Sequence, residues 1–268
     1  MKKELLIIIP VYNEEKSIAG VLKDLREADV YAFADVLLMD DASKDDSVKM
    51  IKNEDCILIQ NSTHKGYGAT IQSGYRYGVE HEYSYIIQMD GDGQHDVENI
   101  PKIFKELKSK GINHRYPDIV IGSRYMEGSS YFRTGNLKMF AITLFRSIIF
   151  SLTGQRVLDP TSGLQGLSRP AFSYYAADGH FDPKYPDANM VLQMLLLKFD
   201  IREVPAKMHN RQYGKGMYSG LKPMFYMCYM GLSLCSIIIK YKWRKTDEGI
   251  GEKDVIWETQ GKSHPTEI

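Results

Sequence analysis

The segment Tyr85-Ile86-Ile87-Gln88-Met89-Asp90-Gly91-Asp92-Gly93-Gln94-His95 passes from a mostly apolar run directly into a polar loop. Residues 85–89 lack the strict polar alternation of a half-exposed strand, so they predict a strand buried on both faces of a sheet. The two glycines let the backbone of the loop turn sharply and approach a ligand closely. A buried strand that delivers reactive side chains at its carboxyl end predicts an α/β fold with its site at one edge of a parallel sheet.

The rest of the chain extends this organisation. Apolar runs alternate with amphipathic stretches, which predicts a mostly parallel sheet flanked by helices and joined by right-handed crossovers. The expected strands are 5–9, 36–39, 56–59, 85–89, 119–121 and 201–208, and the expected helices are 14–29, 44–53, 67–81, 98–110, 138–153 and 187–199. Polar motifs follow four of the first five strands, at 10–14, 40–43, 90–95 and 122–124. We therefore expect one shared site beyond the carboxyl ends of these strands.

Asp90 and Asp92 are the clearest candidates for a metal site. Two carboxylates so close in sequence repel each other unless a cation lies between them. Their hard oxygen atoms suit Mg²⁺ or Mn²⁺, and such an ion neutralises a leaving diphosphate in a transferase. An acidic surface turn is the alternative interpretation. An EF-hand is excluded because His95 stands where its glycine is required, and no phosphate-loop or dinucleotide-binding glycine motif is present.

Four motifs together resemble family 2 glycosyltransferases of the GT-A fold. The likeness is greatest to the branch that contains dolichol-phosphate mannosyltransferase and the bacterial polyprenyl-phosphate sugar transferases, and it covers about residues 4–216. The motifs are Ile9-Pro10-Val11-Tyr12-Asn13-Glu14, Asp40-Asp41-Ala42-Ser43, Asp90-Gly91-Asp92-Gly93-Gln94-His95 and Gly122-Ser123-Arg124. The resemblance implies a GT-A-like (Rossmann-like) domain that transfers a hexose or deoxyhexose, with inversion, from a nucleoside-diphosphate sugar. The implied acceptor is a polyprenyl phosphate or a lipid-linked glycan, in cell-surface polysaccharide or glycoconjugate synthesis.

The same resemblance assigns roles to residues of the first half. The residues implied to line the nucleotide pocket are Pro10, Tyr12, Asn13, Glu14, Asp40, Asp41, Lys65 and Gly68. Asp90, Asp92 and Gln94 are implied to hold the metal ion and the diphosphate. The alternative interpretation of these residues is purely structural. The first two motifs would end strands and cap helices, and the segment around Lys65 would be a flexible helix entry.

The second half supplies the acceptor candidates. Asp159 and Ser162 belong to a segment that resembles the family's D-x-x-S-G element near the reacting centre. Asp159 or Asp187 could act as a general base for a hydroxyl acceptor, whereas a phosphate acceptor is already ionised and needs positioning instead. The basic candidates for phosphate contacts are Arg124, with a catalytic role, and Arg133, Arg211 and Lys215. Each could instead be an ordinary solvated charge, and Gly216 replaces the small hydroxyl residue of the family's R-x-x-G-x-S element.

Composition restricts the partners and the compartment. The 34 basic and 34 acidic side chains balance, which argues against a nucleic-acid partner. The three cysteines are widely spaced and form no CxxC motif, so we expect no disulfide framework and a reducing cytoplasm. The apolar run at 5–9 is short and ends at Pro10, which favours a buried strand over a signal peptide.

Residues 223–239 form an uncharged run of 17, followed by a basic cluster around Trp243. A spanning helix needs about 20 apolar residues. The basic flank favours a helix lying on an anionic membrane surface, and a packed helix or a short spanning helix are the alternatives. We thus expect a catalytic domain over 1–220, an apolar membrane-facing helix over 221–245 and a polar disordered tail over 246–268. The protein is expected to be peripheral on the inner face of the cell membrane.

Two other functions were weighed from the sequence. A sugar-1-phosphate nucleotidyltransferase needs a loop rich in glycine and arginine after its first strand, and residues 10–14 do not provide one. A catalytically inactive membrane-bound scaffold has no use for the carboxylates of Asp90 and Asp92 at the end of a buried strand.

Overall fold

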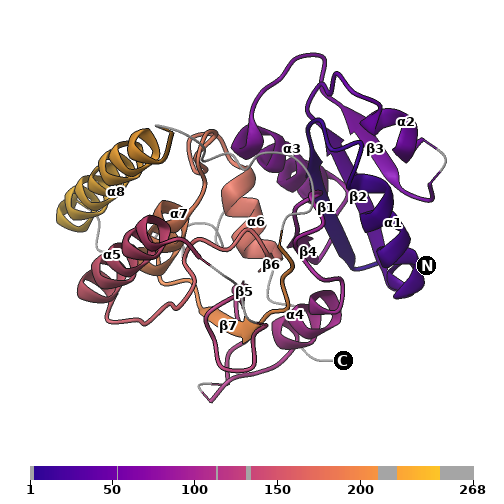
Figure 1. Cartoon of the computed structure of the whole chain (residues 1–268). Helices are drawn as coiled ribbons and strands as arrows, with labels where there is room; N and C mark the ends of the chain where they lie inside the picture. The colour runs from indigo at the N-terminus through magenta and orange to yellow at the C-terminus, as the bar shows by residue number, and fades with distance from the viewer. Residues whose placement is uncertain (1–2, 53, 113, 131–133, 211–221, 248–268) are drawn as a thin grey trace.

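The computed structural model describes residues 3–52, 54–112, 114–130, 134–210 and 222–247. Its centre is a seven-stranded sheet with helices packed on both faces (Figure 1). The strands are β1 (Leu5–Val11), β2 (Ala34–Asp40), β3 (Ile57–Gln60), β4 (Tyr85–Gln88), β5 (Ile119–Ser123), β6 (Gln165–Ser168) and β7 (Ile201–Pro205). Their order in the sheet is β3-β2-β1-β4-β6-β5-β7. The predicted α/β architecture with a mostly parallel sheet is confirmed.

Strand direction explains where the polar motifs meet. Every pair in the sheet is parallel except the two that β6 makes with β4 and β5. The carboxyl ends of the other six strands therefore share one edge, and β6 begins at that edge. The segment 159–163, which leads into β6, arrives beside the motifs that end β1, β2, β4 and β5. The sequence did not predict β6, because four residues that include a glutamine, a glycine and a serine give no apolar run.

Strand β1 lies in the middle of the parallel half of the sheet, between β2 and β4. Its residues 5–9 have no exposed surface, which explains an apolar run without alternation. Leu6 and Ile8 pack into the core on one face of the sheet, whereas Leu5, Ile7 and Ile9 pack into the core on the other. Each such side chain contributes about 1.5–3 kcal/mol to folding relative to an exposed one.

The helices are α1 (Ile18–Glu27), α2 (Ser47–Ile51), α3 (Tyr67–Glu80), α4 (Asn99–Leu107), α5 (Asn136–Thr153), α6 (Arg169–Ala176), α7 (Ala188–Leu196) and α8 (Lys222–Asp247), with a 3-10 turn at Val30–Ala32. Most match the prediction within a few residues. The expected helices 14–29 and 44–53 begin late, because their first residues form the loops that tie β1 to β2. Helix α6 was not predicted. Pro170 lies in its first turn, where the N–H that proline lacks would have no partner within the helix. The expected strand 201–208 ends at Pro205, after which Met208 makes an isolated bridge to His95.

Helices α5 and α8 both pack against α7, and each keeps one apolar face outside (Figure 1). In α8, Met230 and Leu234 are buried, while Phe225, Leu232 and Ile239 are exposed. On α5 the exposed large apolar side chains are Leu137, Phe140, Leu144, Phe150 and Leu152. By length and composition, α5 is the one helix among the described residues that could cross a membrane. The expected boundary near residue 220 and nearly all of the tail 246–268 lie outside the described residues.

Candidate active site

A cleft of about 1230 Å³ opens at the edge of the sheet where the polar motifs meet. It contains ten of the residues singled out from the sequence: Pro10, Tyr12, Glu14, Asp41, Asp90, Asp92, Gln94, Arg124, Ser162 and Asp187. The other five described candidates are not among the lining residues, although each is close in sequence to one that is: Asn13, Asp40, Lys65, Gly68 and Asp159. Arg133, Arg211 and Lys215 lie outside the part of the chain that the structure describes, so their predicted roles stay predictions.

Asp41 organises the loop that begins helix α3. Its side chain is almost fully buried, and its carboxylate accepts hydrogen bonds from the backbone N–H groups of Lys65 and Gly66, both at 2.8 Å. The Asn61 amide donates to it at 3.0 Å. Burial alone would raise the pKa of Asp41, but these hydrogen bonds outweigh burial and lower it. The carboxylate therefore fixes the loop, and Asp41 lines the cleft together with His64 and Gly66.

Asn13 connects the loops that follow β1 and β2. Its backbone N–H donates to Ser43 Oγ at 3.0 Å, and its Oδ1 accepts from the N–H of Lys44 at 2.8 Å. Its φ of 55° lies in the left-handed region, which asparagine tolerates better than most residues. Asn13 thus holds the two strand-end loops together, and its predicted nucleotide role stays a prediction.

Tyr12 and His64 form an aromatic platform at the same end of the cleft. Their ring centroids are 4.1 Å apart, and both side chains are more than one third exposed. Asp41 contacts the His64 ring, with His64 Nδ1 2.8 Å from Asp41 Oδ2. A planar group such as a nucleobase can stack on exposed rings of this kind.

Asp90 and Asp92 line the cleft together, as the metal hypothesis requires. Their loop is tied down on both sides: Asp92 Oδ1 accepts from the N–H of Gln94 at 3.0 Å, and the N–H of Asp90 donates to His95 Nδ1 at 3.0 Å. The Gln94 side chain donates to the carbonyl of His209 at 3.3 Å. These hydrogen bonds therefore fix the loop that carries Asp90 and Asp92.

A chain of buried polar groups aims Asp90 into the cleft. The Tyr67 hydroxyl donates to Asp90 Oδ1 at 2.9 Å and accepts from Gln88 Nε2 at 3.3 Å, while Gln88 Oε1 accepts from Tyr75 at 2.5 Å. Burial, followed by the charge of Asp90, raises the pKa of Tyr67 well above its ordinary value, so this hydroxyl stays a donor. Gly163 lies close beside it: a Cβ there would be 3.1 Å from Asp90 Oδ2, so a larger residue would have to displace this carboxylate slightly. Tyr67 was missed as a site residue, although it lies inside the glycine-rich segment noticed in the sequence.

Arg124 and Asp159 form a buried ion pair below the cleft. Arg124 Nε donates to Asp159 Oδ2 at 2.7 Å and Nη2 donates to Oδ1 at 2.6 Å. Asp159 has no exposed surface, whereas Arg124 lines the cleft. With both oxygens engaged and no opening to the cleft, Asp159 is placed to orient Arg124. This geometry does not favour the role of general base that was considered for it. Ser162, three residues on, donates its hydroxyl to the carbonyl of Gly122 at 2.6 Å.

Asp187, unlike Asp159, lines the cleft. Tyr226 of helix α8 donates to its Oδ2 at 2.5 Å. Burial raises the pKa of Asp187 to about 6, against the opposing effects of the Tyr226 hydrogen bond and of Arg124. At neutral pH this carboxylate is mostly ionised and close to its protonation point.

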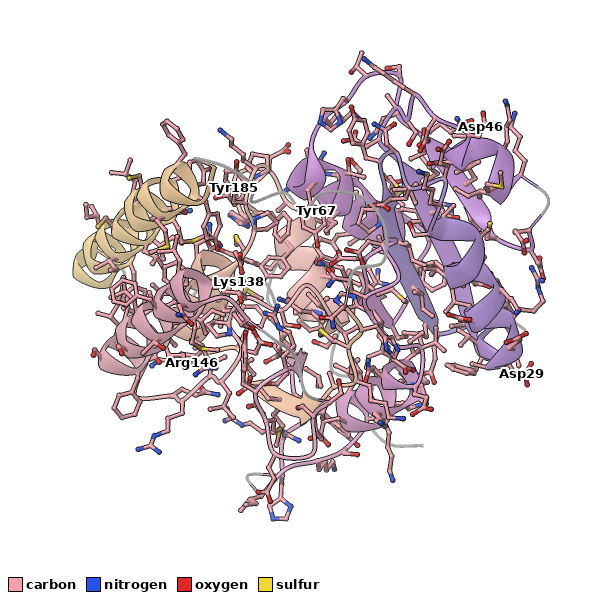
Figure 2. The ribbon with its side chains drawn as sticks, viewed as in Figure 1. Asp29, Asp46, Tyr67, Lys138, Arg146 and Tyr185 are labelled. Atoms are coloured by element: carbon pink, nitrogen blue, oxygen red, sulfur yellow. The ribbon has the colours of Figure 1, made fainter. Side chains whose placement is uncertain are left out.

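Lys138 is a site residue that the sequence did not single out. It projects from the first turn of α5 into the cleft, across from Tyr67 on α3 (Figure 2). Burial within the cleft walls and the positive charge of Arg124 lower its pKa. The carboxylates of Asp187, Asp159 and Asp90 act on it in the opposite direction. As a lysine at the start of an amphipathic helix, it carried no sequence signal that separated it from a solvated charge.

The residues present fit a divalent cation that is completed by substrate. Among the described residues, no group of three or more histidine, cysteine, aspartate or glutamate side chains is placed to hold a metal ion. Asp90 and Asp92 offer hard oxygen atoms to the cleft but only as a pair. This donor set suits Mg²⁺ or Mn²⁺, which keep waters and take further oxygens from a substrate diphosphate.

Characterised relatives match most of the chain. The undecaprenyl-phosphate mannosyltransferase of Micrococcus luteus is 27% identical over 80% of this chain and 87% of its own length. The UDP-N-acetylglucosamine–dolichyl-phosphate N-acetylglucosaminyltransferase of Methanococcus voltae is 27% identical over 85% and 96%, respectively. The polyprenol monophosphomannose synthase of Mycolicibacterium smegmatis is 24% identical over 80% and 81%. None of these three is a scaffold protein or a nucleotidyltransferase.

Solved structures share the fold. Glucosyl-3-phosphoglycerate synthase from Mycobacterium tuberculosis, in complex with Mn²⁺, UDP-glucose and phosphoglyceric acid, superimposes with a TM-score of 0.62. The match covers 89% of this chain and 79% of that one at 17% identity. The same synthase with Mg²⁺ and UDP gives a TM-score of 0.59 at 15% identity.

The family assignment follows from the sequence match and agrees with the fold. Residues 6–175, more than half of the chain, match the family model described as glycosyl transferase family 2. The GT-A-like sheet and the cleft at its carboxyl edge are what the resemblance of the four motifs implied. The chain belongs to glycosyl transferase family 2, and it is a glycosyltransferase.

Proposed function

We propose that this glycosyltransferase moves a hexose or deoxyhexose from a nucleoside-diphosphate sugar to a polyprenyl phosphate at the cytoplasmic face of a membrane. A lipid-linked glycan is the second candidate acceptor, and cell-surface polysaccharide or glycoconjugate synthesis is the expected context. The observation that carries the proposal is that one cleft joins the carboxylate pair Asp90 and Asp92, the cationic side chains of Arg124, Lys138 and Lys184, and an apolar wall. The Micrococcus and Methanococcus relatives, which are named for undecaprenyl and dolichyl phosphate, support the same acceptor class.

The donor occupies the half of the cleft below β1, β2 and α3. The exposed rings of Tyr12 and His64 receive the base, and the loop fixed by Asp41 follows the ribose. The diphosphate then reaches Asp90 and Asp92, the residues that would hold a divalent cation there. That ion, when bound, neutralises the charge that develops on the leaving diphosphate.

The acceptor phosphate occupies the half of the cleft near Arg124 and Lys138. Arginine and lysine at this position offer two positive groups to phosphate oxygens. An ionised phosphate oxygen attacks the anomeric carbon from the side opposite the diphosphate. The bond to the diphosphate breaks with its electron pair, so the configuration inverts. No proton has to leave the nucleophile, and Asp187 positions rather than deprotonates.

The apolar wall suits a lipid. Leu137, Ala141, Ile142 and Phe145 of α5 and Met227 of α8 line the cleft beside the cationic side chains. The outer faces of the same helices expose Phe140, Leu144, Phe225 and Leu232. Helix α8 also packs on α7 along one face, which supports a helix lying on the membrane surface over one that crosses it.

A donor screen tests the proposal. Purified full-length protein is incubated with Mn²⁺, polyprenyl phosphate in detergent, and UDP- or GDP-linked hexoses, and nucleoside-diphosphate release is measured. We expect release that depends on both metal and polyprenyl phosphate. Release that requires a lipid-linked glycan instead selects the second acceptor. No acceptor-dependent release with any donor would overturn the proposed reaction.

A further inference from the structure

The loop at residues 181–187 lies between the donor side of the cleft and helix α8. On its donor side it packs against the start of α3. The carbonyl of Pro183 accepts a hydrogen bond from the N–H of Ala69 at 3.0 Å. Gly68 is required here, because a Cβ at that position would lie 2.3 Å from the backbone oxygen of Asp182. The loop and the first turn of α3 are therefore in direct backbone contact.

On its other side the same loop is held by side chains of α8. The Tyr229 hydroxyl lies 3.0 and 3.1 Å from the two carboxylate oxygens of Asp182, to which it donates. The Asn189 amide donates to both Asp182 Oδ2 and Ser233 Oγ, at 2.8 and 2.9 Å. Tyr185 packs edge-on against Tyr229, with ring centroids 5.2 Å apart.

These contacts come from one face of the helix. Tyr226, Tyr229 and Ser233 are spaced three and four positions apart, so they project toward the loop together. Phe225, Leu232 and Ile239 lie on other faces and are exposed. Helix α8 thus has an inner polar and aromatic face that grips the loop, in addition to its outer apolar face.

The contacts continue from the loop to the donor pocket. The turn that precedes α3 carries the N–H groups of Lys65 and Gly66, which both donate to Asp41. Helix α3 also supplies Tyr67, whose hydroxyl donates to Asp90. A displacement of the 181–187 loop therefore acts on the turn at Lys65 and Gly66. It also acts on Asp90, whose carboxylate is expected to hold the diphosphate.

We propose that Tyr229 is a positioning residue for donor binding. Its hydroxyl fixes Asp182, the 181–187 loop fixes the start of α3, and α3 presents the nucleotide loop and Tyr67 to the donor. Helix α8 therefore sets donor affinity as well as facing the lipid. This inference rests on the proposed function for the location of the donor, but not for the contact path itself.

The test compares Tyr229→Phe with a matched variant, Tyr241→Phe, which removes a hydroxyl from the same helix away from the loop. UDP and GDP, each with Mn²⁺, are titrated calorimetrically into the wild type and both variants. Hydrogen exchange is followed at the amides of residues 65–69. For Tyr229→Phe we expect about fivefold weaker binding of the preferred nucleotide, the lower end of typical coupling between sites, and faster exchange of these amides. Tyr241→Phe should match the wild type in both measurements.

A second variant and the kinetics keep the outcomes distinct. Ser233→Ala removes a more peripheral hydroxyl and should show a smaller change in the same direction if Tyr229→Phe does not fold. In turnover assays, the donor KM should rise while the acceptor KM and kcat stay near the wild-type values. Unchanged nucleotide affinity and unchanged exchange in Tyr229→Phe would overturn the inference. If the wild type binds no nucleotide at all, the proposed function fails, and the exchange experiment still decides whether Tyr229 positions the loop.

Discussion

Arg124 and Asp159 face each other through two hydrogen bonds of 2.7 and 2.6 Å, with the carboxylate fully buried and the guanidinium reaching the cleft. The Arg124 backbone N–H adds a third bond to the same carboxylate at 2.9 Å. Burial alone would lower the pKa of Arg124, but the hydrogen bond and charge of Asp159 raise it, so the guanidinium remains charged. Asp159 therefore holds the Arg124 guanidinium in a fixed position at the wall of the cleft.

Replacement of Asp159 should therefore act first on stability. Asp159→Asn leaves a buried guanidinium without its counter-charge, and breaking a buried pair in this way costs about 3–5 kcal/mol. Thermal and urea unfolding of the variant measure the loss directly. A variant as stable as the wild type would show that the ion pair does not hold this part of the fold.

Asp187→Asn should have the opposite effect on stability at neutral pH. The pKa of Asp187 is raised from 3.8 to about 6, so the folded protein binds a proton more tightly than the unfolded chain. Stability associated with this group is highest below about pH 4, falls as the pH rises to about 6, and stays low above that. The variant lacks this cost and should be more stable than the wild type by about 3 kcal/mol at pH 7, because one pKa unit corresponds to about 1.4 kcal/mol.

The pH dependence provides the control for Asp187. Urea unfolding at about pH 3 and about pH 7 should show a gain in stability only at the higher pH, since at the lower one the wild-type carboxyl group is mostly protonated in both the folded and the unfolded chain. An equal difference at both values would mean that Asp187 acts through packing or through its bond to Tyr226 and not through its charge.

Lys138→Gln tests the acceptor half of the cleft. The substitution keeps a side chain of similar length but removes the charge, so we expect the KM for polyprenyl phosphate to rise by about tenfold, as for the loss of one charge-assisted hydrogen bond. Nucleotide affinity should change little. The matched variant is Lys49→Gln, on the exposed surface of α2, which should behave as wild type. A rise in the donor KM with an unchanged acceptor KM would place Lys138 at the donor instead.

The exposed apolar faces of α5 and α8 should determine membrane binding. We expect Phe140→Ser combined with Phe225→Ser to weaken sedimentation with anionic vesicles, because each exposed aromatic side chain contributes apolar area to the bilayer interface. Ile112→Ser removes an exposed apolar side chain far along the sequence from both helices and should leave sedimentation unchanged. Equal sedimentation of all three proteins would remove these faces from the membrane contact.

The sequence was sufficient to predict most of the strands that end at the carboxyl edge of the sheet and many residues of the candidate site. Strands β1, β2, β4 and β5 are buried on both faces and leave unmistakable apolar runs, and the motifs that follow them converge because parallel strands end at one edge. Tyr67 and Lys138 were missed because their roles depend on packing between distant segments. Asp159 was recognised as belonging to the site, but only the buried partner Arg124 reveals that it orients a charge.

Asp90 and Asp92 are the two carboxylates that we propose to hold a divalent cation. Asp92→Asn keeps an oxygen that can accept from the N–H of Gln94 while removing one negative charge from the pair. We expect turnover to be lost and the melting temperature to be unchanged or slightly raised, because relief of repulsion between neighbouring carboxylates offsets small local losses.

Calorimetric titration of UDP and GDP into the wild type and Asp92→Asn, with and without Mn²⁺, tests this claim most directly. The structure leads us to expect nucleotide binding that requires Mn²⁺ in the wild type and that is lost or greatly weakened in the variant. Binding of equal strength in both proteins, or binding indifferent to Mn²⁺, would show that Asp90 and Asp92 do not hold a cation and a diphosphate at the edge of this sheet.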